Sequence, residues 1–493
     1  MAGELRRRTV RGAAITAVFI VGIDAIVAVQ GLVVTRLLGP EAIGLYGLVA
    51  VTVTTILTLK RVGIDEAFVQ HETDDPQREY QYAFSLELAL SVALALVIVL
   101  LAPVLAIAYD ERELLGLTLA SAYLPVAFAL LAPLWIFFRR MDYAKQRSLQ
   151  VIQPVVSIAV TLPLAATGFG VWSLVVGPAA GYLVAVLVSL RVSPYRLALR
   201  FDRDVTRRYV RFSGWVLVAL GASMAVAQGQ VIAFKIDGGL AAAGYITLAA
   251  TVTRYVDRAD QIVTATIYPA IVAIRGRADS LQELFEKSNR ATLLWVLPFT
   301  CGVVLFAPDL VEFVLGSDWR PARVLLQGLA AAGLLQHLGF NWFAFYRAHG
   351  DPRPPALEAL TGTVAFAVLA IGGLALWGDD GYVWGRITAV AIALIVRWRF
   401  IRELLPHARL APLVAPALVP LAAAAAVTVA LRAALWGGER TVGQAIAEAL
   451  LFAGVYLAGA AWRERPLIAE LLRAVRPVVP GPPASPPGPQ PPA

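Results

Sequence analysis

Long apolar stretches without charged residues recur along the whole chain, and they constrain its fold more than any other feature. A bilayer crossing takes about twenty apolar residues in a helix, because each backbone polar group must be satisfied within the segment. Of the 493 residues, 59% are hydrophobic and only 15% are charged, whereas a soluble domain has about 25% charged residues. The sequence therefore predicts an all-α membrane protein with about fourteen transmembrane helices.

Short polar breaks separate the expected spans. The fifth and sixth spans are divided only by Thr167-Gly168-Phe169-Gly170, which is a tight turn signal. The eighth is too long for one straight crossing, so it is expected to begin or end in the membrane interface. In chain order the predicted spans are 12–35, 43–59, 81–108, 114–138, 151–167, 170–190, 212–234, 240–274, 291–315, 324–346, 356–377, 382–396, 412–435 and 442–462.

Basic residues are unequally divided between the two sides of these spans. If the N-terminus is cytoplasmic and the spans alternate, 32 of the 42 lysines and arginines face the cytoplasm and six face outward. The remaining four lie within spans, at Arg254, Arg258, Arg386 and Arg432. Cytoplasmic loops are enriched in basic residues. The sequence thus predicts a multi-pass protein of the inner or plasma membrane with both termini cytoplasmic. The same asymmetry explains the net charge of +8 without a nucleic-acid partner.

The longest internal basic break covers 191–211 and divides the chain into six helices followed by eight. It is interpreted as a cytoplasmic linker between two bundles. The segment 466–493 is basic and then proline-rich, so it is expected to form a disordered cytoplasmic tail.

Searches for catalytic motifs find none. None of the four lysines follows a glycine, which argues against a phosphate-binding loop. The four histidines have no metal-binding spacing, and the single cysteine, Cys301, allows no disulfide within the chain. No break is long enough for an external catalytic domain. We therefore expect no enzyme activity, no cofactor and no metal.

Ionisable residues inside a span are the informative candidates, because each costs roughly 2.5–3.5 kcal/mol at mid-bilayer on insertion scales. The eighth span carries Arg254, Asp257, Arg258 and Gln261 at i, i+3, i+4 and i+7, which places them on one helical face. One interpretation is a neutralised polar stripe that packs against neighbouring helices. The other is the cationic wall of a water-filled cavity, in which guanidinium groups hold an anionic substrate.

Five further residues are candidates for the same cavity, each with a structural alternative. Asp24 in the first span either binds an arginine or a coupling cation, or makes a hydrogen bond between helices. Lys60 and Arg61 end the second span and either snorkel as topology anchors or reach the cavity. His337 and Asn341 lie one turn apart and form either a packing pair or a substrate contact.

Four motifs resemble those of a known family. Residues 36–47 read RLLGPEAIGLYG, and within 140–177 the segment MDY is followed by GFGVWSLV at 168–175. Residues 243–249 read AGYITLA, and residues 315–319 read LGSDW. Their order and spacing over roughly residues 5–410 resemble the Wzx-like polysaccharide flippases of the colanic-acid-type branch. These flippases belong to the multidrug/oligosaccharidyl-lipid/polysaccharide exporter superfamily.

The resemblance implies alternating access by two six-helix lobes arranged in a V. The lobes would cover 1–192 and 212–410, joined by the linker at 193–211, with two extra helices at 411–465. It implies the export of an isoprenoid-pyrophosphate oligosaccharide for cell-surface polysaccharides such as lipopolysaccharide or exopolysaccharide. Membrane lipids, a polysaccharide polymerase and glycosyltransferases are the other expected partners. A cation-coupled multidrug exporter of the same superfamily and a membrane glycosyltransferase or polymer ligase stay open as alternatives.

Overall fold

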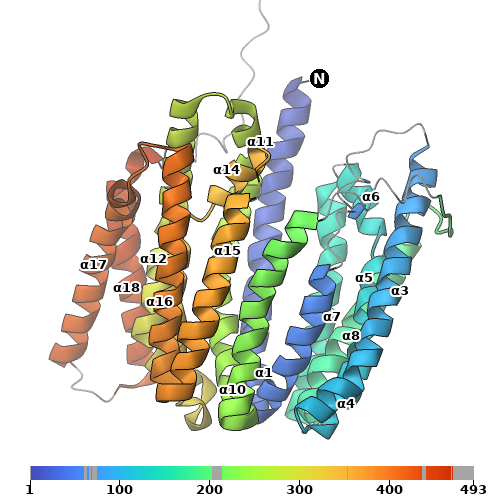
Figure 1. The fold of residues 1–493 in the computed structure, drawn as a ribbon, viewed down its shortest axis with the longest axis horizontal. Coiled ribbons are helices and arrows are strands. Elements are labelled where there is room, and N and C mark those ends of the chain that lie inside the picture. Colours follow the sequence, from blue (N-terminus) through green and yellow to red (C-terminus); the bar gives the residue numbers. More distant parts are fainter. Residues whose placement is uncertain are drawn as a thin grey trace, which may run out of the picture.

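A computed structural model of the chain describes residues 2–59, 64–65, 68, 75–140, 142–202, 214–351, 353–435, 440–467 and 469. Throughout these residues the regular secondary structure is helical, and no strand occurs in them. The long helices stand roughly parallel to one another (Figure 1). This arrangement confirms the predicted all-α membrane fold.

The first part of the bundle consists of one long kinked helix and the segments that follow it. These are α1 (Ala2–Leu59), α3 (Pro76–Ala108), α4 (Arg112–Ser121), α5 (Leu124–Leu130), α6 (Pro133–Arg139), α7 (Tyr143–Ala166) and α8 (Ser173–Val192). α4, α5 and α6 together occupy the fourth predicted span. Pro125 and Pro133 lie in the first turns of α5 and α6, where a missing N–H group leaves no hydrogen bond unmade.

The middle part of the bundle has more interruptions. It comprises α10 (Gly214–Thr253), η2 (Arg254–Val256), α11 (Asp257–Ile274), α12 (Ala278–Asp309), η3 (Leu310–Leu315), α13 (Ala322–Gln336), α14 (Trp342–Ala348), α15 (Arg353–Ala365), η5 (Phe366–Ile371) and α16 (Gly372–Leu404). The 3-10 turn η2 divides the eighth predicted span, and the turn between α13 and α14 divides the tenth. Both interruptions lie where an unbroken transmembrane helix was expected.

Ten helical stretches in the described residues are long and apolar enough to cross a membrane, and α13 is a shorter apolar helix. Three of the ten, at 25–58, 225–256 and 353–404, each overlap two of the predicted spans, with a glycine kink between them. Gly39 has φ 78° and Gly239 has φ 77°, a region in which residues with a Cβ atom are strained. Gly39 and Pro40 break α1 between the first two predicted spans, and each of the predicted spans corresponds to a helical segment.

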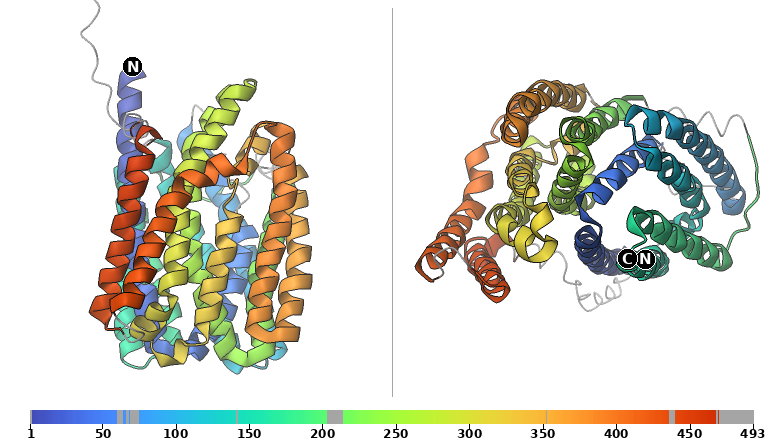
Figure 2. Two further views of the ribbon diagram at one scale, coloured as in Figure 1. Left: turned by 90° about the vertical axis from the view of Figure 1, so that its left-hand side faces the viewer. Right: turned by 90° about the horizontal axis from the view of Figure 1, so that it is seen from below.

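Glycines let α1 and α10 touch through their backbones. A Cβ atom at Gly44 would overlap the carbonyl group of Leu240, and one at Gly244 would overlap the carbonyl group of Pro40. Gly44 and Gly244 therefore allow the two helices to approach closely. Figure 2 shows α1, in blue, against α10, in green, near the middle of the bundle viewed from below.

The C-terminal helices α17 (Leu410–Leu435) and α18 (Val442–Arg463) form a hairpin that packs on α12. At one end of α12, Asp309 joins Arg432, Arg440 and Glu448 in a buried ionic cluster. Within it, Arg440 lies 2.8 Å from Asp309 and 2.6 Å from Glu448, while Arg432 lies 2.9 Å from Glu448.

A second ionic contact fixes the hairpin at the other end of α12. Arg290 lies 2.6 Å from Glu464, whose side chain is almost fully buried. Residues 203–211 of the predicted linker lie outside the described residues, and so does the predicted tail apart from residues 466, 467 and 469.

Candidate functional site

A polar cavity of about 730 Å³ lies between α1 and the middle part of the bundle. Its walls come from the second half of α1 and from α10, η2, α11, α13, α15 and α16. Threonines and glutamines line much of it, including Thr54, Thr55, Thr58, Thr251, Gln228, Gln230 and Gln336. These neutral groups provide hydrogen-bonding surface at membrane depth, where polar residues usually face a cavity or a partner.

Several of the threonine hydroxyl groups donate to carbonyl oxygens of their own helices. Thr55 donates to the carbonyl oxygen of Val51 at 2.8 Å, and Thr251 donates to that of Thr247 at 2.7 Å. The side chain of Gln230 accepts a hydrogen bond from the hydroxyl group of Tyr382 at 2.9 Å. Since each hydroxyl oxygen retains acceptor capacity, the walls are compatible with both water and hydroxyl-rich ligands.

Arg397, one of the arginines that line the cavity, makes its contacts with other parts of the protein. Arg397 lies 2.8 Å from the carboxylate of Glu358 and donates to the carbonyl oxygen of Leu338 at 3.1 Å. It also donates to the carbonyl oxygen of Gln336, the last residue of α13. Arg397 therefore satisfies backbone groups that the interruption after α13 leaves free, and Glu358 neutralises its charge.

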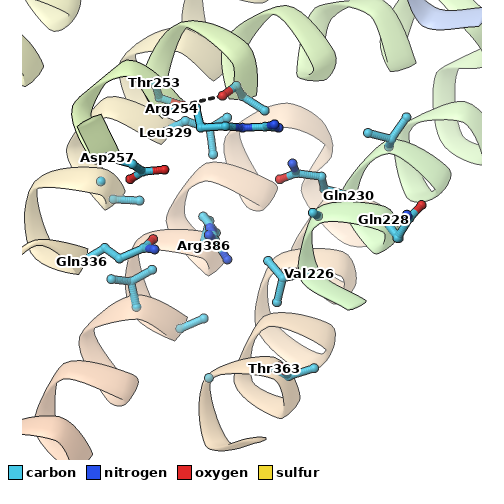
Figure 3. Close-up of a pocket in the computed structure, with 18 of the residues that line it drawn as sticks. Val226, Gln228, Gln230, Thr253, Arg254, Asp257, Leu329, Gln336, Thr363 and Arg386 are labelled. Carbon is cyan, nitrogen blue, oxygen red and sulfur yellow. Dashed lines mark hydrogen bonds between the residues drawn. The ribbon is translucent and has the colours of Figure 1, made fainter. Parts of the chain in front are cut away.

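Two further arginines line the cavity without a carboxylate partner among the described residues. Arg386 has its guanidinium carbon 5.3 Å from the centre of the Phe366 ring, and its buried Nε atom has no hydrogen-bond partner. Arg254 is exposed at the start of η2. Figure 3 shows Arg254, Arg386 and Gln230 around the same open space. Two unneutralised guanidinium groups make this part of the cavity a suitable place for an anion.

A histidine and two carboxylates meet where the two interrupted helices face each other. The Nε2 atom of His337 lies 3.2 Å from Oδ1 of Asp257 and 3.2 Å from Oδ2 of Asp260. Its Nδ1 atom lies 2.6 Å from the carbonyl oxygen of Gly333. The side chain of His337 is 4% exposed, whereas that of Asp257 is 44% exposed and lines the cavity.

The structure brings together three of the predicted site residues, namely Arg254, Asp257 and His337. Asn341 does not line the cavity. It is buried, donates to Ser288 at 2.6 Å and accepts from Asn289 at 2.9 Å. The remaining predicted residues cannot be placed, because the side chains of Asp24, Arg258 and Gln261 and the whole of Lys60 and Arg61 lie outside the described residues.

Sequence reasoning did not select Arg386 or the pair of Arg397 and Glu358 as site residues. Arg386 carries the same signal as Arg254, an arginine inside an apolar span, but no charged residue of its predicted span 382–396 flanks it at helical spacing. Arg397 and Glu358 lie at the ends of separate spans and look like interfacial residues in the sequence. Only the packing of α15 against α16 turns them toward the cavity.

Several solved structures share this fold. The lipid II flippase MurJ, in an inward closed conformation, aligns with a TM-score of 0.64 at 12% identity and covers 92% of this chain and 100% of its own. An inward-facing multidrug resistance MATE family transporter of the MOP superfamily aligns with a TM-score of 0.61 at 15% identity and covers 77% of this chain and 96% of its own. The chain therefore has the fold of this class of multi-pass membrane proteins.

The sequence comparisons narrow this class to a family. The profile of the family described as polysaccharide biosynthesis protein matches residues 33–324, and the chain belongs to this family. The succinoglycan biosynthesis transport protein ExoT of Rhizobium meliloti (strain 1021) is 23% identical over 374 residues, covering 71% of this chain and 74% of ExoT. These matches confirm the family resemblance inferred from the four motifs.

Proposed function

We propose that the chain is a flippase that carries isoprenoid-pyrophosphate-linked oligosaccharides across the cytoplasmic membrane for the synthesis of a cell-surface polysaccharide. Family membership supports a role in polysaccharide biosynthesis, and the related protein ExoT is named as a succinoglycan transport protein. The shared fold with a lipid II flippase agrees with a lipid-linked cargo. A multidrug exporter of the same superfamily is the alternative, although the family match favours the flippase.

The observation that carries the proposal is the pair of unneutralised arginines in a polar cavity. A pyrophosphate presents several negatively charged oxygens, and guanidinium groups bind such oxygens with paired, charge-assisted hydrogen bonds. Arg254 and Arg386 provide these donors, while the threonine and glutamine walls suit the hydroxyl groups of a glycan. The isoprenoid tail needs no polar site, because it remains in lipid.

Alternating access would then follow from movement of the two lobes expected at 1–192 and 212–410. The cavity lies between the second half of α1 and helices of the second lobe, so relative movement of the lobes would change its access. The hairpin at 411–465 would move with the second lobe, because it packs on α12. Both termini and the linker at 193–211 would be cytoplasmic, as the distribution of basic residues suggests.

Substitution of the two arginines tests the proposal. We expect Arg254→Ala and Arg386→Ala each to reduce export of the surface polysaccharide about tenfold or more, since a charge-assisted hydrogen bond contributes about 1.5–3 kcal/mol. Arg→Lys should reduce export less, because lysine keeps the charge but not the paired donors. Export is measured as surface glycan in a strain that lacks its own copy, alongside the abundance of the protein in the membrane.

Arg399→Ala is the matched control. Arg399 is on α16 like Arg386, but it is exposed and pairs with Glu403 at 3.4 Å, away from the cavity. Its replacement should leave export unchanged. Wild-type export by the double variant Arg254→Ala, Arg386→Ala would refute the proposal. Transport of organic cations, with no movement of lipid-linked glycan in vesicles, would favour the multidrug alternative.

A further inference from the structure

The cluster of His337, Asp257 and Asp260 contains more acceptors than donors. The Nδ1 atom of His337 faces the carbonyl oxygen of Gly333 at 2.6 Å, and a carbonyl oxygen can only accept, so Nδ1 carries hydrogen. In a neutral imidazole the other nitrogen, Nε2, is then an acceptor. Nε2 faces one carboxylate oxygen of Asp257 and one of Asp260, each at 3.2 Å. A further proton must therefore lie among the three groups to avoid contact between three acceptors.

This proton lies at the buried Nε2 atom of His337, between the carboxylates of Asp257 and Asp260. Neither contact of Nε2 has the geometry of a direct hydrogen bond, as expected for one N–H group shared between two acceptors. One oxygen of Asp260, Oδ1, is buried and also lacks a partner. Among the described residues, no group of three or more histidine, cysteine, aspartate or glutamate side chains is arranged to hold a metal ion. The geometry thus suits a proton.

Several charged groups from neighbouring elements line the same cavity as this cluster. Besides Arg386, those whose side chains are described are Arg254 on η2, Glu358 on α15 and Arg397 on α16. Arg397 and Glu358 neutralise each other. Arg254 is the one of the three without a carboxylate partner among the described residues, and it is three residues before Asp257, where η2 meets α11.

We infer that the His337–Asp257–Asp260 cluster binds a proton whose presence keeps Arg254 free for the anionic substrate. With the proton bound, imidazolium Nε2 holds Asp257. On release, the proton leaves Nε2 through the exposed carboxylate of Asp257 into cavity water, and the ring becomes a neutral imidazole with hydrogen on Nδ1. Asp257 then faces an acceptor instead of a cation, turns to Arg254 and competes with the pyrophosphate. This inference rests on the proposed function.

Thermodynamic linkage makes the effect reciprocal. If a bound proton raises the affinity for pyrophosphate, bound pyrophosphate raises the affinity for the proton by the same factor. Binding of an anion should therefore be accompanied by uptake of about one proton at pH values where the empty cluster has released it. The apparent affinity should fall by up to about tenfold for each unit of rising pH in that range.

Calorimetric titration with inorganic pyrophosphate tests the inference on the purified full-length protein. Titrations in two buffers of different ionisation enthalpy give the number of protons taken up, between about pH 5.5 and 8.5, where histidine commonly titrates. We expect the wild type to take up about one proton more than His337→Gln at the upper end of this range. The protonation of pyrophosphate itself contributes equally to both proteins and cancels in this difference. Asp257→Asn, at a half-exposed position, provides a second variant if His337→Gln folds poorly, and it should lose the same proton.

His349→Gln is the matched control. His349 follows α14 as His337 follows α13, and its Nδ1 atom lies 2.8 Å from the carbonyl oxygen of Phe345. No carboxylate of the described residues lies within ion-pair distance of His349, so its replacement should leave proton uptake at the wild-type value.

The outcomes separate the inference from the proposed function. Equal proton uptake by wild type and His337→Gln, with pyrophosphate binding that still depends on Arg254 and Arg386, would overturn the inference alone. Binding that is absent, or that persists in the double arginine variant, would refute the proposed site and the inference with it. Loss of one proton in both cluster variants, with the wild-type value in the control, supports both.

Discussion

Replacement of Glu448 by glutamine tests whether the buried ionic cluster holds the C-terminal hairpin on α12. The carboxylate of Glu448 is fully buried and lies 2.6 Å from Arg440 and 2.9 Å from Arg432. Asp309 provides the other negative charge, so the cluster is neutral. Glu448→Gln preserves the shape of the side chain but leaves two arginines with one carboxylate.

The expected destabilisation by Glu448→Gln is large because the ionic cluster is buried. Opposite unit charges about 4 Å apart attract by about 4 kcal/mol at an effective dielectric constant of about 20. Desolvation offsets part of this gain, and the loss of one member of a buried pair typically costs about 3–5 kcal/mol, because the other is left uncompensated. If α17 and α18 open as one local unit, the opened population should rise about a hundredfold to a few thousandfold.

Hydrogen exchange measured by mass spectrometry provides the assay. Exchange of the amides of α18 should accelerate by this factor in Glu448→Gln, while amides of α8, which lies elsewhere in the bundle, should be unaffected. Glu312→Gln is the control, since Glu312 makes the same kind of contact with Arg320 at 2.9 Å but is exposed. Equal exchange of α18 in the two variants would refute the reasoning. Arg440→Leu combined with Glu448→Leu should restore much of the protection, because the charges are then removed as a pair.

Two further predictions concern the crossing of α1 with α10 and the topology. Gly44→Ala should destabilise the crossing by about 1–3 kcal/mol, because its Cβ atom overlaps the backbone of α10, and thermal unfolding in detergent should begin at a lower temperature. Gly31→Ala, in the same helix with open space at its Cβ position, should have no such effect, and similar loss in both variants would contradict the explanation. Reporter fusions after Arg211 and after Arg465 should report the cytoplasmic side, and a periplasmic signal at either point would exclude the predicted topology.

The helices were predictable because the bilayer requires about twenty apolar residues for each crossing, and this length is visible in the sequence. The helix break at Arg254–Val256 was not predictable, because this segment contains neither glycine nor proline. The expected stripe treated Asp257 as a neighbour of Arg254 on one continuous helix. In the structure Asp257 begins α11 and contacts His337 instead.

The site was only partly predictable for a related reason. Arg254, Asp257 and His337 were selected because ionisable groups are rare in spans. Their contact depends on two helix interruptions, at η2 and after α13, that lie side by side in the fold. No local sequence pattern predicts such a tertiary contact. Asn341 was selected because it lies one turn after His337, which suggested a shared role. In the structure the chain turns after α13, and Asn341 contacts Ser288 and Asn289 instead.

The glycine crossing of α1 and α10 has a mechanical consequence. Interlocked side chains must leave their rotamers before two helices can rotate against each other, because packed interiors resist small displacements. Gly44 and Gly244 instead set backbone against backbone, with the carbonyl groups of Leu240 and Pro40 as the contact points. At these two positions backbone atoms set the distance between the helices, so a change in the angle between them requires no change of side-chain rotamer at Gly44 or Gly244.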